Sequence, residues 1–211
     1  MSSTNYKEIC IWKDESNCEG CEVCQHIFCR YTSKYRLMYA ASFIPMLFAG
    51  LTIGFSALSL TLKLVSLIGW IVYMFFFLNV WESHMLCNHC VYYANPNEKT
   101  LNCPIDKGKM KTGTYNPGPL TISEKIQFFT GFALFAGFPI PFMIIGKLYV
   151  VLAIYVALFA LWILLIQTKV CNACVNFACP INRVDPKIRA EFMKRNPLIR
   201  KAWEEKGYHF D

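Results

Sequence analysis

The chain has 211 residues, of which 55% are hydrophobic and 17% are charged, and its formal net charge is +7. This length and the positive mean hydropathy of +0.33 leave two broad classes, a single globular domain or a small membrane protein. The sequence holds no GxxxxGK[ST] or GxGxxG motif, so nothing predicts nucleotide binding. The positive charge comes without a basic helix or a groove of stacking aromatic residues, and it therefore does not indicate a nucleic-acid partner.

The first 36 residues form a polar arm that carries five cysteines. Cys10 is followed by a group with the spacing Cys-x2-Cys-x2-Cys-x4-Cys, which consists of Cys18, Cys21, Cys24 and Cys29. Five basic and five acidic residues cancel in this arm, and no apolar period predicts a long helix. We expect the arm to fold around a metal or against other loops.

Four later stretches contain no Asp, Glu, Lys, Arg or His: Leu37–Leu62, Leu64–Trp81, Ile126–Gly146 and Leu148–Thr168. Each is long enough to span the hydrocarbon core of a bilayer as a helix. A soluble helix of this length normally has a polar face, and these stretches have none. The sequence therefore predicts an all-α membrane protein with four transmembrane helices. The third is expected to be broken toward its outer end by Pro139 and Pro141.

The four spans predict two transmembrane hairpins, residues 37–81 and 126–168, that separate three polar segments: the arm 1–36, a loop 82–125 and a tail 169–211. Lys63 and Lys147 are placed in the two tight hairpin turns, and the other nineteen of the 21 basic residues lie in the polar segments. The positive-inside rule places these segments and both termini on the cytoplasmic side of the cell membrane, where they can contact anionic lipid.

All eleven cysteines lie in the same three polar segments. In a reducing compartment, such clustering favours metal or redox chemistry over a disulfide framework. The loop also contains Thr121 and Glu124, which predict a capping box at the start of the third span. In the tail, Asp185 before Pro186 and Asn196 before Pro197 predict two short helices, lying on the membrane surface or covering the cysteines.

One motif occurs twice. Residues 87–94, CNHCVYYA, recur as residues 171–178, CNACVNFA, and each copy then reaches Cys-Pro-Ile, after eight inserted residues in the first copy. Lys63 and Lys147 both precede their copy by 24 residues, so the repeat unit is a membrane helix followed by three cysteines. The six cysteines are Cys87, Cys90 and Cys103 in the first copy and Cys171, Cys174 and Cys179 in the second.

A duplicated Cys-x-x-Cys with a third cysteine predicts metal binding, because two sulfurs reach one ion and the third adds a ligand. For zinc, His84 and His89 could complete the first site, but Ala173 stands opposite His89 in the second copy. For an iron–sulfur cluster, four thiolates are needed, and a proline directly after the cysteine is typical of ferredoxins. The missing thiolate could come from the arm, or the arm could hold a cluster of its own.

Four spans with two cytoplasmic cysteine–proline motifs resemble the polyferredoxin-type membrane subunits that link quinols to soluble redox partners. The resemblance covers residues 87–104 and 171–180, although that family uses a tighter spacing and usually carries full ferredoxin octets, which are absent here. It implies that Cys87, Cys90, Cys103, Cys171, Cys174 and Cys179 are cluster or signature cysteines. It also implies a [4Fe–4S] cluster, a quinone or other membrane carrier, and a cytoplasmic redox partner.

The sequence therefore predicts a membrane electron-transfer subunit with one or two iron–sulfur clusters on the cytoplasmic face. One alternative is a zinc-stabilised membrane scaffold without redox activity. Another is a cysteine-dependent membrane enzyme acting on a thiol or a lipid, for example with Cys87 beside His84 or His89. The spans hold no histidine and no acidic residue, which argues against a bis-histidine haem in the bundle and against the usual proton relay.

Overall fold

The computed structural model describes residues 6–14, 18–30, 36–41, 43–54, 56–105 and 107–210. In these ranges the chain is helical without strands, apart from one isolated antiparallel bridge between Thr100 and Met110. The helices are α1 (Glu22–His26), α2 (Arg36–Ala40), α3 (Phe43–Gly54), α4 (Leu60–Phe76), α5 (Glu82–Met85), α6 (Ile122–Gly137), α7 (Ile140–Ile145), α8 (Tyr149–Lys169), α9 (Pro186–Arg195) and α10 (Pro197–Glu204). The predicted all-α class is confirmed.

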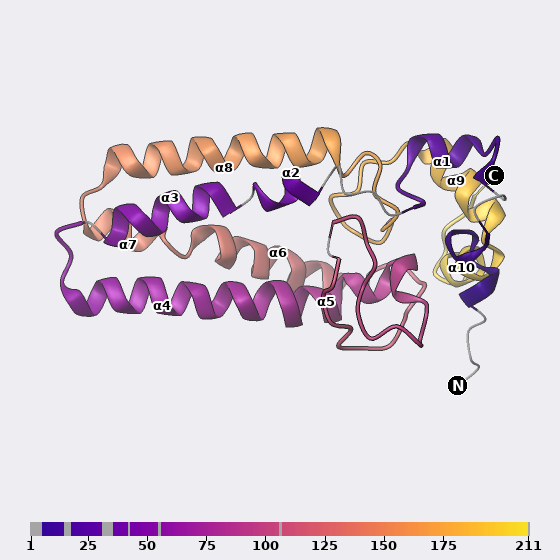
Figure 1. The fold of residues 1–211 in the computed structure, drawn as a ribbon, viewed down its shortest axis with the longest axis horizontal. Helices are drawn as coiled ribbons and strands as arrows, with labels where there is room; N and C mark the ends of the chain where they lie inside the picture. The colour runs from indigo at the N-terminus through magenta and orange to yellow at the C-terminus, as the bar shows by residue number, and fades with distance from the viewer. Residues whose placement is uncertain are drawn as a thin grey trace.

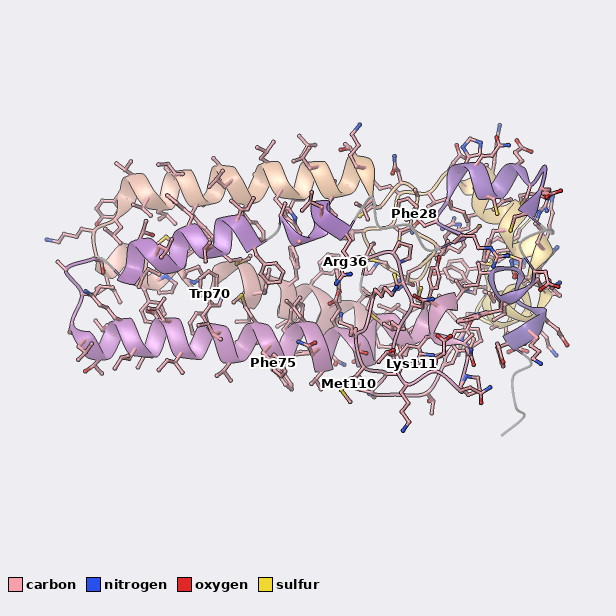
Figure 2. All side chains as sticks on the ribbon, in the orientation of Figure 1. Phe28, Arg36, Trp70, Phe75, Met110 and Lys111 are labelled. Atoms are coloured by element: carbon pink, nitrogen blue, oxygen red, sulfur yellow. The ribbon has the colours of Figure 1, made fainter. Side chains whose placement is uncertain are left out.

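Within the described residues, three helical stretches are long and apolar enough to cross a membrane: Leu60–His89, Ile122–Ile145 and Tyr149–Lys169. Much of their apolar surface faces outward. Phe75 on α4 is 69% exposed and points away from the bundle in Figure 2, and Val150 on α8 is 75% exposed. Apolar side chains at such positions are favoured in hydrocarbon and disfavoured in water, so the fold is consistent with a membrane protein.

The first predicted span differs from the structure. Its helix α3 has 12 residues, follows α2 along the bundle in Figure 1, and packs against α4 and α8. The placement of Lys63 in the hairpin turn is wrong, because α4 already begins at Leu60. The helix starts there because the Ser59 hydroxyl accepts a hydrogen bond from the backbone N–H of Leu62 at 3.4 Å. Lys63 therefore lies in the first turn of α4.

The capping box and the proline break predicted for the third span are both present. The Thr121 side chain accepts from the backbone N–H of Glu124, and the Glu124 carboxylate accepts from the backbone N–H of Thr121, which forms the capping box of α6. The helix breaks after Gly137, where Pro139 and Pro141 remove two backbone donors, and α7 continues the chain to the turn. Lys147 lies in this turn, as predicted, with φ of 55°.

Aromatic residues of α4 and α8 join these helices to α6 in the interior of the bundle. Trp70 donates its indole N–H to the carbonyl of Phe135 at 3.2 Å, and Tyr73 donates its hydroxyl to the carbonyl of Gly131 at 2.8 Å. From α8, Tyr155 donates to the carbonyl of Ala136 at 2.7 Å. A carbonyl oxygen in a helix has a second lone pair that the helix does not use. The indole N–H and the two hydroxyls can therefore form hydrogen bonds inside an apolar bundle without breaking the backbone hydrogen bonds of α6.

Between α4 and α5 the helix passes through a π-helical turn, Phe77–Trp81, which directs Phe77 against α6. Phe77 is 2% exposed, and its ring packs onto Gly131, where a Cβ atom would overlap the ring. π-Helical turns occur frequently beside functional sites because they re-aim a side chain without ending the helix. Here the turn and the glycine together set the position of Phe77.

The polar segments gather at one end of the bundle, and we call this region the cap: residues 6–14 and 18–30 of the arm, 82–105 and 107–121 of the loop, and 170–210 of the tail (Figure 1). One apolar core joins the three segments and includes Ile9, Val23, Val91, Tyr92, Phe177, Phe192 and Trp203. Trp12 donates to the carbonyl of Val91 at 3.0 Å, and Trp203 donates to the carbonyl of Pro117 at 3.0 Å. The two predicted tail helices, α9 and α10, therefore pack on the arm and loop.

We expect Gly131→Ala to destabilise the protein, because the new Cβ has no room against the Phe77 ring. Overpacking of this kind costs about 1–3 kcal/mol. The matched control is Gly137→Ala at the end of the same helix, where a Cβ meets no atom within 4 Å. Thermal unfolding in detergent should show a lower Tm for the first variant only, and equal Tm values for the two variants would contradict this packing.

Candidate functional site

A cavity of about 160 Å³ lies where the helices meet the cap, and all six cysteines of the duplicated motif line it. We call this cavity the thiol chamber. Its apolar wall is formed mainly by Phe77, Phe128, Phe132, Phe135, Trp162 and Ile166. A cavity of about 150 Å³ is known to hold a benzene molecule, so the chamber has room for a compact group much larger than one ion.

Each copy of the motif reaches the chamber by a tight turn at the end of a long helix. In the first copy, the backbone N–H of Cys90 bonds to the carbonyl of Cys87 at 2.9 Å. In the second, the backbone N–H of Cys171 bonds to the carbonyl of Ile166, in the last part of α8, at 2.9 Å. The copies are joined directly by the buried Asn176, whose side-chain amide donates to the carbonyl of Leu86 at 3.0 Å.

Thiols of the two copies interact with one another at the chamber. The Cys90 thiol interacts electrostatically with Cys103 of its own copy and with Cys174 of the other. The Cys174 thiol interacts with Cys103 of the first copy and with Cys179 of its own. The lining of one cavity by all six cysteines thus brings the two copies into a single site.

The first cysteine of each copy lies beside a basic residue instead. The Lys109 ammonium is 4.0 Å from the Cys87 sulfur and 2.7 Å from a carboxylate oxygen of Glu82, and the Lys109 side chain is only 6% exposed. In the second copy, the backbone N–H of Arg183 bonds to the carbonyl of Cys171 at 2.9 Å. The positive charge of Arg183 opposes the effect of burial on the pKa of Cys171.

The eight inserted residues of the first copy explain how Lys109 arrives there. Leu101 and Lys109 pair through a backbone hydrogen bond of 2.8 Å, and Lys111 bonds back to Lys99 at 3.0 Å. The insertion therefore lets the loop fold back on itself and return a lysine to the start of the motif. The sequence did not identify Lys109 or Glu82 as residues of the site. The only indication was the position of Glu82, a single acidic residue directly after the second predicted span.

Burial dominates the acidity of the chamber thiols. It raises the pKa of Cys90 and Cys174 well above the usual value, and the neighbouring thiols add to this effect. Burial likewise raises the pKa of Cys179 to about 12 and raises the pKa of Cys171. These four thiols are therefore neutral near pH 7 in the metal-free chain, and a bound metal would have to displace their protons.

The four arm cysteines lie apart from the chamber, on and around α1. The arm reaches the chamber through Phe28, which sits at the junction of bundle and cap in Figure 2 and lines the cavity. The Phe28 N–H bonds to the carbonyl of Ala173 at 2.8 Å, and the Tyr92 hydroxyl donates to the Phe28 carbonyl at 2.8 Å. Phe28 thus contacts both copies, a role that the sequence pattern did not reveal.

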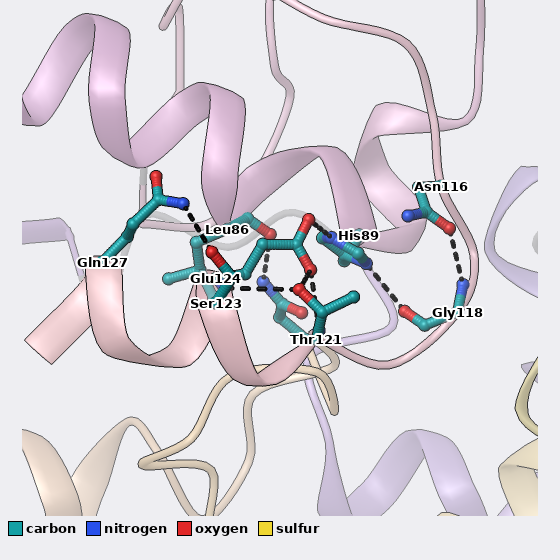
Figure 3. Close-up of polar contacts among 9 residues, drawn as sticks. Leu86, His89, Asn116, Gly118, Thr121, Ser123, Glu124 and Gln127 are labelled. Carbon is teal, nitrogen blue, oxygen red and sulfur yellow. Dashed lines mark hydrogen bonds and ion pairs between the residues drawn. The ribbon is translucent and has the colours of Figure 1, made fainter. Parts of the chain in front are cut away.

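His89 makes contacts away from the sulfurs (Figure 3). Its Nδ1 lies 2.7 Å from the carbonyl oxygen of Gly118, and its Nε2 lies 3.4 Å from a carboxylate oxygen of Glu124. With its side chain fully buried, His89 fastens the loop to the N-terminus of α6. Both ring nitrogens are engaged in this arrangement, so His89 serves the cap as a structural residue.

The raised thiol pKa values predict a stability loss in alkaline solution for the metal-free protein. Unfolded thiols ionise near pH 9.0, whereas Cys179 keeps its proton in the folded chain up to about pH 12. The folded state thus binds more protons in this window, and the free energy of unfolding falls as the pH rises through it. Melting curves from pH 8 to 11 should show a falling Tm, with a shallower slope for Cys179→Ala. A Tm independent of pH in both proteins would contradict the burial of these thiols.

In the part of the chain that the structure describes, no three Cys, His, Asp or Glu side chains are arranged as a ready metal-binding group. No protein-family model matches the chain, and comparisons with curated proteins and with solved structures found no match either. The chemistry of the site therefore follows from its own residues, which are six thiols around one apolar cavity.

Proposed function

We propose that this chain is a membrane electron-transfer protein whose centre is a single iron–sulfur cluster in the thiol chamber. The supporting observation is that the six cysteines of both copies line one cavity. The duplication alone is compatible with one cluster or two, and the shared cavity favours one.

The residues of the chamber fit such a group in chemistry and in room. Thiolates are the ligands that iron–sulfur clusters require, and four of them suffice. Cys90, Cys103, Cys174 and Cys179 would hold the cluster, because they line the cavity and Cys90 and Cys174 each interact with thiols of both copies. Loading requires these thiols to ionise and adjust their rotamers, and the cluster would then supply one-electron redox chemistry.

Two cations at the edge of the chamber support this assignment. Four thiolates bring negative charge into an apolar site, which is costly unless positive groups lie nearby. Arg183 acts on Cys171, and Lys109 lies beside Cys87 while also pairing with the Glu82 carboxylate at 2.7 Å. Because Cys87 and Cys171 interact with these cations, we assign them to the surroundings of the cluster.

The chamber wall suggests where electrons enter and leave. Aromatic side chains from the spans, including Phe77, Phe132 and Trp162, form its membrane side. A quinone or another apolar carrier is suited to this side, because such a molecule dissolves in the bilayer and packs on aromatic rings. A soluble redox partner would approach the opposite side, through the cap.

The proposed topology has four crossings with the cap in the cytoplasm. The arm packs in one core with the loop and tail, so the chain must leave the cap after residue 30 and return to it along α4. The helices α2 and α3 follow one another along the bundle from the cap toward the turn before α4 (Figure 1). The basic residues of the arm, loop and tail favour the cytoplasm for the cap.

The iron content of cysteine variants tests the proposed ligands. Cys90→Ser and Cys174→Ser should each remove nearly all the iron and acid-labile sulfide from anaerobically purified protein, because both copies serve one centre. The matched controls Cys87→Ser and Cys171→Ser should keep most of it, since these cysteines lie at the edge.

Loss of about half the iron in each single variant would contradict one shared centre and indicate two separate ones. Colourless wild-type protein with bound zinc would contradict the electron-transfer proposal and favour a zinc-stabilised scaffold. Colourless protein without any metal, whose thiols react with a substrate, would favour a cysteine-dependent enzyme.

The proposed topology predicts which thiols an impermeant reagent reaches in intact cells. A cysteine placed at Lys147, in the turn between α7 and α8, should be labelled from outside in a variant that keeps the eleven native cysteines. The native cysteines should react only after the membrane is permeabilised, because the cap is inside. Labelling of Cys103 in sealed cells, without labelling at position 147, would reverse the orientation.

A further inference from the structure

The cysteines of the arm form a second cluster that the thiol chamber does not use. Two successive turns bring three of them together: the N–H of Cys21 bonds to the carbonyl of Cys18 at 3.1 Å, and the N–H of Cys24 bonds to the carbonyl of Cys21 at 3.1 Å. Cys24 lies in α1, which ends at His26, and the N–H of Cys29 then bonds to the carbonyl of Ile27 at 2.8 Å. The four cysteines therefore follow one another on the turns of one short segment.

The side chains meet around Cys24. Cys18, Cys21 and Cys29 are the thiols that act on the pKa of Cys24, which burial raises. Cys21 and Cys29 are buried, at 8% and 4% exposure. Arg30 lies beside these cysteines. Its guanidinium donates to the Cys18 sulfur at 3.4 Å and to the backbone carbonyl of Lys13 at 2.7 Å.

We propose that Cys18, Cys21, Cys24 and Cys29 bind one zinc ion as a structural site, independent of the centre in the thiol chamber. Four sulfurs of this kind are a common donor set for tetrahedral zinc. Zinc binding would displace the thiol protons, and rotations about the Cα–Cβ bonds would bring the sulfurs to the ion.

The short arm segment favours a single ion here over a cluster. Zinc–sulfur bonds of about 2.3 Å place four tetrahedral sulfurs about 3.8 Å apart. A cluster separates its ligands by the width of its iron and sulfide core, as an open chamber allows. The arm cysteines lie on successive turns of one segment, residues 18–29, whereas the chamber cysteines line a cavity of about 160 Å³. The two cysteine groups therefore suit different cofactors.

The arm site has a structural consequence for the rest of the cap. Cys29 directly follows Phe28, which is bonded to both copies of the motif and lines the chamber. At the other end of the arm, the Cys10 N–H bonds to the side-chain carbonyl of Asn196 at 2.7 Å, between α9 and α10. An ion bound at Cys24 would fix the segment between these two anchors and so hold the arm on the tail helices.

The test is to measure the zinc and iron contents per chain separately in the full-length protein purified in detergent. The wild type should carry about one zinc per chain, and Cys24→Ser should lower the zinc content about tenfold, since three thiolates remain. Cys10→Ser is the matched control, because Cys10 lies in the same arm but contacts Asn196. It should keep its zinc. Iron should be retained in both variants, so a loss of zinc alone is distinguishable from a failure of the chamber.

A second measurement does not depend on a variant that folds. Zinc is removed from the wild type with a chelator and then titrated back in competition with a chromophoric chelator, while hydrogen exchange is followed in the arm and α9. We expect tight uptake of one equivalent with slower exchange in both segments. The proposal is overturned if the wild type binds no zinc under these conditions, or if Cys24→Ser binds as much as the wild type.

Discussion

The arrangement of the cap depends on the contact between the two copies of the motif. Asn176 of the second copy donates a buried hydrogen bond to the carbonyl of Leu86, just before the first copy. Phe28 of the arm then bonds to Ala173 on one side and Tyr92 on the other. An unsatisfied buried amide or carbonyl costs about 1–3 kcal/mol, so these bonds hold the copies in one relative position. The chamber exists because the two loops are fixed face to face.

The surroundings of the chamber differ among its six cysteines. Burial keeps the thiols of Cys90, Cys174 and Cys179 protonated in the metal-free chain. Cys87 lies beside a buried lysine, and Cys171 lies near an arginine. Positions in one motif therefore have different electrostatic surroundings.

The sequence predicted the parts of the fold that depend on local chemistry. The capping box at Thr121, the break at Pro139 and the two tail helices after Asp185 and Asn196 are all present. The boundary at Lys63 was wrong because one cap at Ser59 started α4 earlier than the charge pattern implied. A charged residue marks the end of an apolar stretch, but a hydrogen bond decides where the helix starts.

The site was less accessible from sequence because it depends on distant contacts. The repeat identified all six cysteines, yet nothing in the spacing showed whether they meet in one place or two. Phe28 contacts the motif from the arm, and Lys109 contacts Cys87 from 22 residues further along the chain. The sequence does not show that either residue lies near a cysteine in space. His89 looked like a ligand by proximity, whereas the fold uses both of its nitrogens to hold the loop.

Both copies of the motif line one chamber, and cross-linking in membranes can show whether their cysteines meet. Metal-free protein is treated with a short bifunctional thiol reagent, and linked peptides are identified by mass spectrometry. We expect links between the copies, from Cys90 or Cys103 to Cys174 or Cys179, at low protein density where links between chains are rare. Links confined to Cys87–Cys90 and Cys171–Cys174, with none between the copies, would contradict a shared chamber.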